Sequence, residues 1–182
     1  MLRIIAGKYR SRLLKQPSKT TTRPTIDRAR EGIFSSIHFE IENKEFLDLF
    51  SGSGSFCFEA LSRGAKKATC VEKDIDAYKI ILENKNNLKE ENLLAFNTNA
   101  ISFLNKNLEK KYDFVYLDPP FLEKELLVKC LDLLTNNAML NQGGKIIIET
   151  DWANFNYENN NFIISKVKKY GKIFIYFIQN RT

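Results

Sequence analysis

The sequence predicts an α/β fold built on a mostly parallel seven-stranded sheet with an antiparallel edge. Strand-like and helix-like segments alternate from position 46 to position 149, a pattern typical of βα units joined by right-handed crossovers. Two strand-like segments then follow, joined by a turn at Tyr170-Gly171, which predicts a final antiparallel hairpin. With 182 residues, the chain is long enough for one well-buried domain and too short for two ordinary ones.

The first residues are predicted to form a basic arm, residues 1–24, ahead of a main domain, residues 25–182. Residues 4–14 alternate in character and are interrupted by Gly7, where a turn or bulge fits. We therefore expect a small β-hairpin with one basic face. Residues 16–23 are polar and rich in threonine, so we interpret them as a loop.

The main domain is predicted to alternate strands and helices. Pro24-Thr25 opens its first helix, whose apolar residues keep helical spacing to about position 38. Short segments rich in β-forming residues predict the strands, which are residues 46–50, 68–72, 93–97, 114–117, 145–149, 162–168 and 173–178. Amphipathic segments predict the other helices, which are residues 55–63, 75–88, 101–108 and 123–134. We expect a turn at Gly143-Gly144 and a polar, asparagine-rich loop over residues 152–161.

Composition argues against membrane and disulfide-rich proteins. The chain is 43% hydrophobic and 27% charged, and its longest uninterrupted apolar run, residues 173–178, is far too short to span a bilayer. No secretory signal opens the sequence, so we expect a cytoplasmic protein that does not contact a membrane.

Cys57, Cys70 and Cys130 are widely spaced and odd in number, which predicts free core cysteines. The only histidine, His38, is interpreted as a surface or packing residue, and we expect no metal site.

Positive charge is concentrated near the amino terminus. The net charge is +6, but residues 1–30 contain nine Lys or Arg and a single acid, Asp27, so this segment carries +8 and the remainder −2. A basic arm on a nearly neutral body predicts a polyanionic partner. The alternatives are a solvated lysine-rich face and a compositional bias toward Lys and Asn. Bias explains the arm poorly, because the arm contains arginines, whose planar guanidinium groups suit phosphates and stacked bases.

The most informative motif is a hydrophobic strand that ends in an acid and two prolines. Residues 114–117 predict a buried strand, and Asp118-Pro119-Pro120-Phe121 cannot continue it, because proline donates no hydrogen bond to a ladder. In an open α/β sheet, ligands bind at the carboxyl ends of strands, where the strand order reverses. We therefore expect Asp118 and Phe121 beside a ligand. The alternative for Phe121 is a hydrophobic plug that caps the sheet.

A glycine-containing loop, residues 48–54, lies between the first core strand and its helix. Its two glycines allow a tight turn and close approach to a ligand, and the helix that follows offers free N–H groups. The third glycine of a dinucleotide fingerprint would fall at Cys57, which disfavours NAD. Glu72 ends the second core strand eighteen residues after Gly54 and predicts a nucleoside ligand, because a carboxylate there accepts from both ribose hydroxyls. The alternative is a solvated acid at a strand end.

The third core strand is followed by Asn99-Ala100, which would offer an amide and a backbone N–H to an adenine edge. Capping of the next helix by Asn99 is the competing interpretation. Because the first and fourth strands of a doubly wound sheet are neighbours, the glycine loop and Asp118 are expected to share one crevice.

These motifs carry a family resemblance. Asp118-Pro119-Pro120-Phe121 resembles the motif of S-adenosylmethionine-dependent amino methyltransferases, and residues 48–54 resemble their cofactor loop. Three further segments resemble the bacterial small-subunit rRNA guanine-N(2) methyltransferases, the RsmD family: Ile5-Ala6-Gly7 with Arg10; Arg23-Pro24-Thr25 with Asp27, Arg28, Arg30 and Glu31; and residues 59–65. No motif of the family is matched from Asp151 onward. The resemblance implies a Rossmann-like class I methyltransferase fold.

The resemblance also implies a reaction, namely methyl transfer from S-adenosylmethionine to the exocyclic 2-amino group of one guanine in 16S rRNA of the small ribosomal subunit. We expect a monomer. Asp118 and the Pro119 carbonyl would accept the two N–H bonds of the amine, and Phe121 would stack on the extruded base. The expected cofactor contacts are Asp48, Phe50, Ser51, Gly52, Gly54, Glu72, Lys73, Asn99 and Ala100. The expected RNA contacts, which bind phosphates without reading sequence, are Lys8, Arg10, Arg12 and Arg23.

Three alternatives are open from the sequence. The first is an amino methyltransferase that acts on DNA adenine or another RNA. The second is a non-catalytic RNA-binding module with the same fold, against which the intact glycine loop, Glu72 and Asp118 argue. The third is a nicotinamide oxidoreductase.

Overall fold

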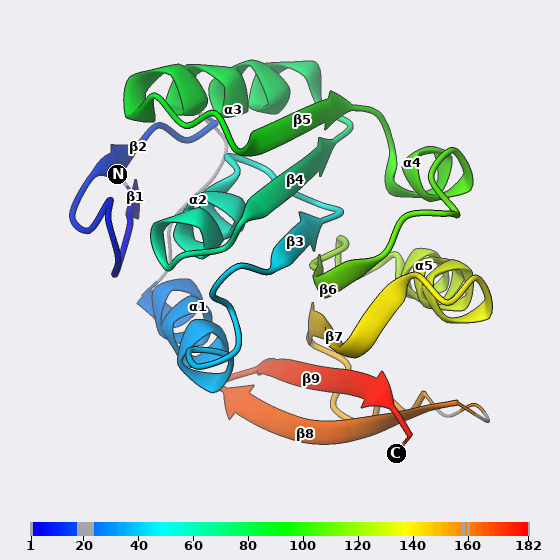
Figure 1. Ribbon diagram of the computed structural model, residues 1–182. Coiled ribbons are helices and arrows are strands. Elements are labelled where there is room, and N and C mark those ends of the chain that lie inside the picture. The colour runs from blue at the N-terminus through cyan, green and yellow to red at the C-terminus, as the bar shows by residue number, and fades with distance from the viewer. Residues whose placement is uncertain (1, 18–23, 158, 160, 182) are drawn as a thin grey trace.

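The computed structural model describes residues 2–17, 24–157, 159 and 161–181, which fold around a seven-stranded sheet (Figure 1). The strand order is β5-β4-β3-β6-β7-β9-β8. The strands are β3 (Glu45–Asp48), β4 (Lys67–Glu72), β5 (Leu93–Asn97), β6 (Tyr112–Leu117), β7 (Leu140–Thr150), β8 (Phe162–Tyr170) and β9 (Ile173–Asn180). The pairs among β3 to β7 are parallel, whereas β9 is antiparallel to both β7 and β8. The predicted fold class is therefore confirmed.

The strand order reverses between β3 and β6. From β3 the chain moves outward to β4 and β5, and it then returns to place β6 on the other side of β3. Phe46 pairs with Phe114, and Asp48 pairs with Tyr116. The carboxyl ends of β3 and β6 therefore lie side by side, and the glycine loop and Asp118 share one edge of the sheet as predicted.

In the described part of the chain, five helices cover the two faces of the sheet (Figure 1). On one face lie α1 (Pro24–Ser36), α2 (Ser55–Ser62) and α3 (Ile75–Leu88), and on the other lie α4 (Ala100–Asn105) and α5 (Lys124–Asn136). The helix predicted over residues 101–108 ends early, because the Asn107 side-chain amide donates to the Phe103 carbonyl (2.7 Å) and closes the last turn. None of the described helices is both long enough and apolar enough to cross a membrane.

The fifth core strand is longer than predicted. β7 begins at Leu140, which pairs with Tyr112, and the register shifts before Lys145 pairs with Phe114. The expected turn at Gly143-Gly144 is therefore an irregular stretch within the strand. A Cβ on Gly144 would lie 2.9 Å from the Asn141 carbonyl oxygen, so glycine is needed there for close approach of the backbone.

The asparagine-rich segment over residues 152–161 contributes more to the core than its polar composition predicts. Phe155 is buried, and its ring meets those of Trp152 and Tyr176 edge-on, each at 5.2 Å between centroids. The Tyr176 hydroxyl donates to the carbonyl oxygens of Trp152 and Ala153, both at 2.8 Å. These aromatic residues fasten the segment to the face that α4 and α5 cover.

The remaining single-residue predictions concern the cysteines and the histidine. Cys57, Cys70 and Cys130 are free and buried, as predicted. His38 is exposed next to the ring of Phe39, 5.0 Å away between centroids, and is a surface residue.

The amino-terminal hairpin is confirmed but is shorter than predicted. Its strands are β1 (Leu2–Arg3) and β2 (Leu13–Leu14), and residues 6–11 form turns rather than an extended basic face. Gly7 adopts φ +84° where a Cβ would lie 1.8 Å from the Ser62 carbonyl oxygen, so the chain bends against α2 and cannot stay extended.

Buried contacts join this hairpin to the main domain. Leu2, Ile4 and Leu14 belong to the core under α1, α2 and α3, and Figure 1 shows the hairpin beside α2. The buried carboxylate of Glu59 accepts hydrogen bonds from the Ile5 N–H (2.8 Å) and the Ala6 N–H (3.1 Å). The hairpin is therefore packed as part of the globular body.

Candidate active site

A cavity of about 600 Å³ opens at the carboxyl ends of β3, β4 and β6, a volume typical of small-molecule sites. It is formed by the glycine loop, the end of β4, the turn after β5 and the segment between β6 and α5. Nine predicted site residues line it: Phe50, Gly52, Glu72, Lys73, Asn99, Ala100, Asp118, Pro119 and Phe121. The other lining residues are Leu49, Val71, Thr98, Pro120, Glu123 and Leu126. The structure thus brings most of the predicted cofactor and catalytic residues together.

Two backbone positions with positive φ shape the glycine loop. Gly52 has φ +52° and Gly54 has φ +79°, a region that glycine enters without steric cost. A Cβ on Gly54 would lie 3.0 Å from the Phe58 ring, whereas one on Gly52 would meet nothing within 4 Å. Gly52 therefore faces open space, and Gly54 packs inward.

Three of the predicted cofactor residues, Asp48, Ser51 and Gly54, do not line the cavity, because they are buried beneath the loop. Asp48 Oδ1 accepts the N–H of Phe50 (3.0 Å). The Ser51 hydroxyl donates to the Asp48 carbonyl (2.9 Å) and accepts the N–H of Val71 (3.0 Å). These contacts fix the shape of the loop from below, and burial raises the pKa of Asp48 to about 7.

Glu72 connects the glycine loop to the end of β4. Its Oε2 accepts the N–H of Gly52 (2.8 Å), and its Oε1 accepts the N–H of Asp74 (2.7 Å). Each carboxylate oxygen has about two acceptor positions, so one on each remains for a ligand. Next to it, the Lys73 ammonium approaches Glu123 of the α5 start at 3.9 Å, and this exposed pair borders the cavity.

Asn99 caps α4, because its side-chain oxygen accepts the Ser102 N–H (2.9 Å). The capping interpretation is therefore confirmed. Asn99 and Ala100 also line the cavity, so the cap places this helix start at the site.

The segment after β6 forms a tight turn at the mouth of the cavity. The Glu123 N–H donates to the Pro120 carbonyl (2.8 Å), which places Phe121 and Leu122 at the two central positions of the turn. Phe121 is 39% exposed and lines the cavity, whereas Leu122 is 98% exposed. Polar residues are usual at such turn centres, so two apolar side chains there suit contact with another molecule.

Sequence reasoning missed two residues beside Asp118. Tyr116 and Glu149 are buried, and the Tyr116 hydroxyl donates to Glu149 Oε2 (2.7 Å). The pKa of Asp118 is held well above its usual range, first by burial and then by the charges of Glu149 and Asp48. The available sequence signal for Glu149 was an acid at the carboxyl end of the predicted strand over residues 145–149.

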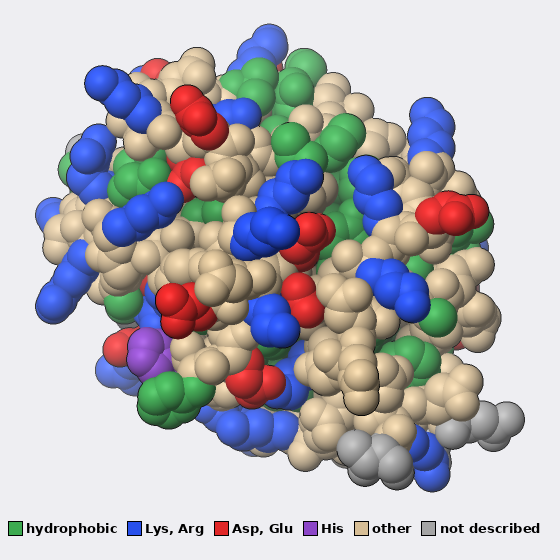
Figure 2. Space-filling view, in the orientation of Figure 1, with side chains coloured by type: hydrophobic (Ala, Val, Ile, Leu, Met, Phe, Trp, Pro, Cys, Tyr) green, Lys and Arg blue, Asp and Glu red, His purple; other side chains and the backbone are tan. Residues whose placement is uncertain are grey.

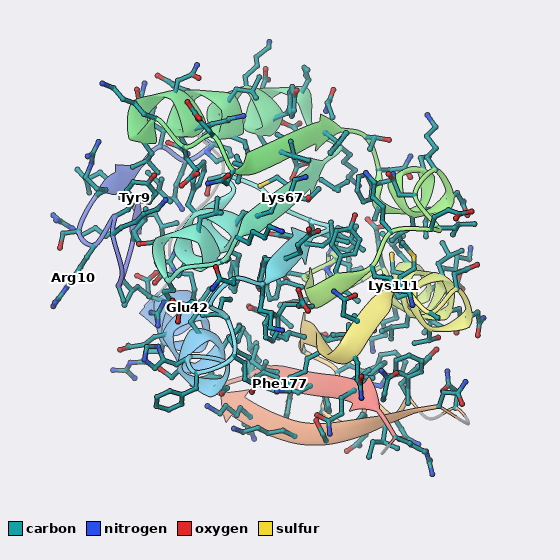
Figure 3. All side chains as sticks on the ribbon, viewed as in Figure 1. Tyr9, Arg10, Glu42, Lys67, Lys111 and Phe177 are labelled. Carbon is teal, nitrogen blue, oxygen red and sulfur yellow. The ribbon has the colours of Figure 1, made fainter. Side chains whose placement is uncertain are left out.

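The predicted RNA contacts differ in how free their side chains are. Lys8 pairs with the buried Glu90 at 2.8 Å, and Arg12 donates to the Asn87 carbonyl at 3.1 Å. Arg10 is exposed, and Figure 3 shows its side chain pointing away from the body of the protein. Arg23 lies outside the described residues. Lys and Arg side chains gather over the hairpin at the left of the molecule (Figure 2).

Comparison with known proteins identifies relatives along nearly the whole chain. The model of a family described as "Conserved hypothetical protein 95" matches residues 2–179. Ribosomal RNA small subunit methyltransferase D of Escherichia coli strain K12 is 37% identical over 153 residues, which cover 84% of this chain and 76% of that protein. The protein of the same name from Haemophilus influenzae is 38% identical, with 82% of this chain and 79% of that protein covered.

A solved structure agrees with this result. A putative methyltransferase from Escherichia coli superposes with a TM-score of 0.89 at 33% identity, covering 100% of this chain and 98% of that one. The resemblance predicted from the motifs is confirmed, and the α/β domain is a methyltransferase domain. The chain belongs to the RsmD family, the family of ribosomal RNA small subunit methyltransferase D.

Proposed function

We propose that this protein transfers a methyl group from S-adenosylmethionine to the exocyclic 2-amino group of one guanine in 16S rRNA. Membership of the RsmD family supports the reaction, and the names of the relatives support a ribosomal RNA substrate. The observation that carries the proposal is the cavity, in which the glycine loop, Glu72 and Asp118-Pro119-Pro120-Phe121 meet.

The cavity suits an adenosine-containing cation. Glu72 keeps acceptor positions for the two ribose hydroxyls, and Gly52 leaves space for close approach of a ligand to the backbone. Ala100 and Asn99 border the place for the base, and Phe50 supplies an apolar wall. Asp48, Ser51 and Gly54 shape the loop from below, and Lys73 stands at its rim. The cofactor supplies an electrophilic methyl group on a sulfonium.

Asp118, Pro119 and Phe121 are proposed to hold the target guanine. The guanine amine is a weak nucleophile because its lone pair is delocalised into the ring, so alignment supplies much of the catalysis. The Asp118 carboxylate and the Pro119 carbonyl accept the two N–H bonds and turn the lone pair toward the methyl group. Phe121 stacks on the base, which has to leave its own stack to reach the cavity. Leu122 stands beside it on the same turn.

The amino-terminal arm, residues 1–24, is proposed to bind the phosphates of the RNA through Arg10, with Lys8, Arg12 and Arg23 adding positive charge. Residues 25–182 carry the reaction. The substrate is the small ribosomal subunit in the cytoplasm, and the protein acts as a monomer without a metal ion.

A methyl-transfer assay tests this function. Unmodified small subunits and free 16S rRNA are each incubated with the protein and S-adenosylmethionine, and the nucleosides are identified by mass spectrometry. We expect N(2)-methylguanosine from the wild type and none from Asp118→Ala. Methylation of adenine, or of an RNA other than 16S rRNA, would show that the proposed substrate is wrong. Failure to bind S-adenosylhomocysteine in a thermal-shift measurement would exclude the enzyme altogether.

A further inference from the structure

Three acids lie at or next to the carboxyl ends of the neighbouring strands β3, β6 and β7, on one face of the sheet. Asp48 pairs with Tyr116 across β3 and β6, and Leu117 pairs with Ile148 across β6 and β7. The next positions, Asp118 and Glu149, are therefore neighbours. Because side chains at paired and alternate positions of parallel strands share a face, Asp48, Tyr116, Asp118 and Glu149 all point to the side that α1 and α2 cover.

The surroundings of these acids are mostly apolar. Phe56 of α2 stacks on Tyr116 with 3.8 Å between ring centroids, and Ile175 of β9 pairs with Glu149. Glu149 is 3% exposed and Asp48 1%, while Asp118 is open to the cavity on one side. Among the described side chains, the Tyr116 hydroxyl donates a hydrogen bond to the Glu149 carboxylate.

The charged groups on the neighbouring elements are engaged elsewhere. Arg30 of α1 donates to the Arg3 carbonyl (2.8 Å) and to Asp27 (3.3 Å). Its buried Nε has no hydrogen-bond partner among the described residues, and its charge acts on Tyr116 rather than on Asp118 or Glu149. On α2, Glu59 pairs with Arg63 at 2.7 Å. Glu72 at the end of β4 adds a further negative charge beside Asp48. Within the described part of the chain, no Lys or Arg forms an ion pair with Asp48, Asp118 or Glu149.

Three neighbouring carboxyls without a cation cannot all be charged. Burial, Glu149 and Asp48 hold the pKa of Asp118 well above its usual range. Burial also raises the pKa of Glu149, but the hydrogen bond from Tyr116 opposes that rise. Because Asp118 and Glu149 are neighbours and neither pairs with a cation, the empty site disfavours the state in which both are ionised, and the two carboxyls titrate as a unit.

We propose that Glu149 is a positioning residue for the reaction, which acts through Asp118: the pair holds one proton while the site is empty, releases it when a cationic ligand enters, and regains it when the product forms. This inference rests on the proposed function, because the cation is the sulfonium of S-adenosylmethionine. It assigns Glu149 and Tyr116 a part in recognising the charge of the cofactor.

The proton balance closes over one turnover. Entry of the sulfonium favours the ionised pair, so one proton leaves to solvent and Asp118 becomes the carboxylate that accepts the guanine N–H. In the transfer a C–N bond forms, the C–S bond breaks with its electron pair on sulfur, and one amine proton passes to Asp118. The sulfur of the product carries no charge, so the carboxyl pair is again protonated. An ionised pair would not stabilise the bound product.

The sign of the pH dependence follows from this balance. Below the pKa of the pair, each unit of falling pH makes deprotonation about tenfold harder, so the affinity for S-adenosylmethionine falls by up to about tenfold. The affinity for S-adenosylhomocysteine, which has a neutral sulfur, changes much less over the same range. Selectivity for the charged cofactor should therefore increase with pH.

Calorimetric titration of the intact protein tests the proposal. Dissociation constants for S-adenosylmethionine and S-adenosylhomocysteine are measured from pH 5.5 to pH 8.5, each in two buffers with different ionisation heats, so that proton release is counted directly. We expect about one proton to be released per S-adenosylmethionine bound near neutral pH and almost none per S-adenosylhomocysteine.

Two variants move this titration in opposite directions. In Glu149→Gln the amide oxygen still accepts the Tyr116 hydroxyl, but a neighbouring charge is removed. The midpoint, which is the pH at the middle of the change in affinity for S-adenosylmethionine, should therefore fall by about one pH unit or more. Tyr116→Phe removes the donor that favours ionised Glu149, so the midpoint should rise. Glu90→Gln, a buried acid beside the hairpin, is the matched control and should leave the midpoint unchanged.

The outcomes separate this inference from the proposed function. The shared proton is refuted if the affinities for the two nucleosides depend equally on pH, or if the pH profile of Glu149→Gln superposes on that of the wild type. Neither result contradicts the proposed methyltransferase activity. Loss of fold in either variant would show in its melting curve, and the wild-type proton count then decides alone. Absence of binding by both nucleosides rejects the proposed function and the pair with it.

Discussion

The cavity and the amino-terminal hairpin both hold charged residues that the sequence singles out, but the fold uses them differently. At the cavity, Glu72 and Asp118 face open space and keep acceptor positions. On the hairpin, Lys8 neutralises Glu90, Arg12 binds the Asn87 carbonyl, and Arg10 extends into solvent. A short motif at a strand end therefore predicts a site better than a count of charges does, because much of the hairpin charge stabilises the fold.

The largest effect expected from this comparison is on catalysis at the cavity. Asp118→Asn removes the carboxylate proposed to accept the amine N–H and take its proton, so the rate of methyl transfer should fall about 10³-fold. Binding of S-adenosylhomocysteine should persist, because its proposed contacts are to other parts of the cavity. Single-turnover kinetics beside a binding titration measure both, and a variant of wild-type rate would refute the role of Asp118.

The next effect concerns how the hairpin is held. Glu59→Gln leaves Arg63 without its buried partner and weakens the acceptor for the Ile5 and Ala6 N–H groups, so unfolding should become easier by about 3 kcal/mol. Denaturant titration measures this change. The matched control is Glu83→Gln, which removes an exposed ion pair with Lys15 and should cost about 0.5 kcal/mol or less.

A smaller effect is expected at the turn that borders the cavity. Phe121→Ala removes a ring proposed to stack on the target base, and kcat/KM for the RNA substrate should fall about tenfold, as expected for a stacking contribution of about 1–3 kcal/mol. Phe39→Ala is the control, since Phe39 is 96% exposed but lies away from the cavity. An equal loss in both variants would argue against a specific stack.

The smallest effect separates free from engaged charge on the hairpin. Arg10→Ala should weaken RNA binding a few-fold and lower the salt slope by about one, with no change in melting temperature. Lys8→Ala should lower the melting temperature, because it leaves the buried Glu90 unpaired. Affinity measured against salt, together with thermal unfolding, tests both. An unchanged salt slope in Arg10→Ala would remove that residue from the RNA surface.

Local patterns predicted the sheet and most of the cavity because the central strands β3 and β6 are short apolar segments that each end in a recognisable breaker. The two prolines stop β6, and the glycine loop follows β3, so the edge of the sheet that carries the cavity could be placed before any tertiary contact was known. Gly54 and Ser51 were expected to touch the cofactor, yet they shape the loop from beneath. Sequence spacing locates such a loop but does not reveal which of its atoms face inward.

Tertiary contacts account for what the sequence did not predict. The hairpin bends because Gly7 meets Ser62 of α2, a partner 55 positions away in the chain. Glu149 lies beside Asp118 only because β7 pairs with β6, and Lys8 is engaged only because the hairpin packs near Glu90. None of these neighbours is encoded by local periodicity, since each depends on how distant segments pack.

The most direct test of the central claim is the N(2)-methylguanosine content of 16S rRNA. The measurement uses bacterial cells that lack their own enzyme of this family and carry either the wild-type gene or Asp118→Asn. We predict that the wild type restores the modified nucleoside and that Asp118→Asn, present at equal level and able to bind S-adenosylhomocysteine, does not. Restoration by Asp118→Asn, or no restoration by a wild-type protein that binds the cofactor, would contradict the account.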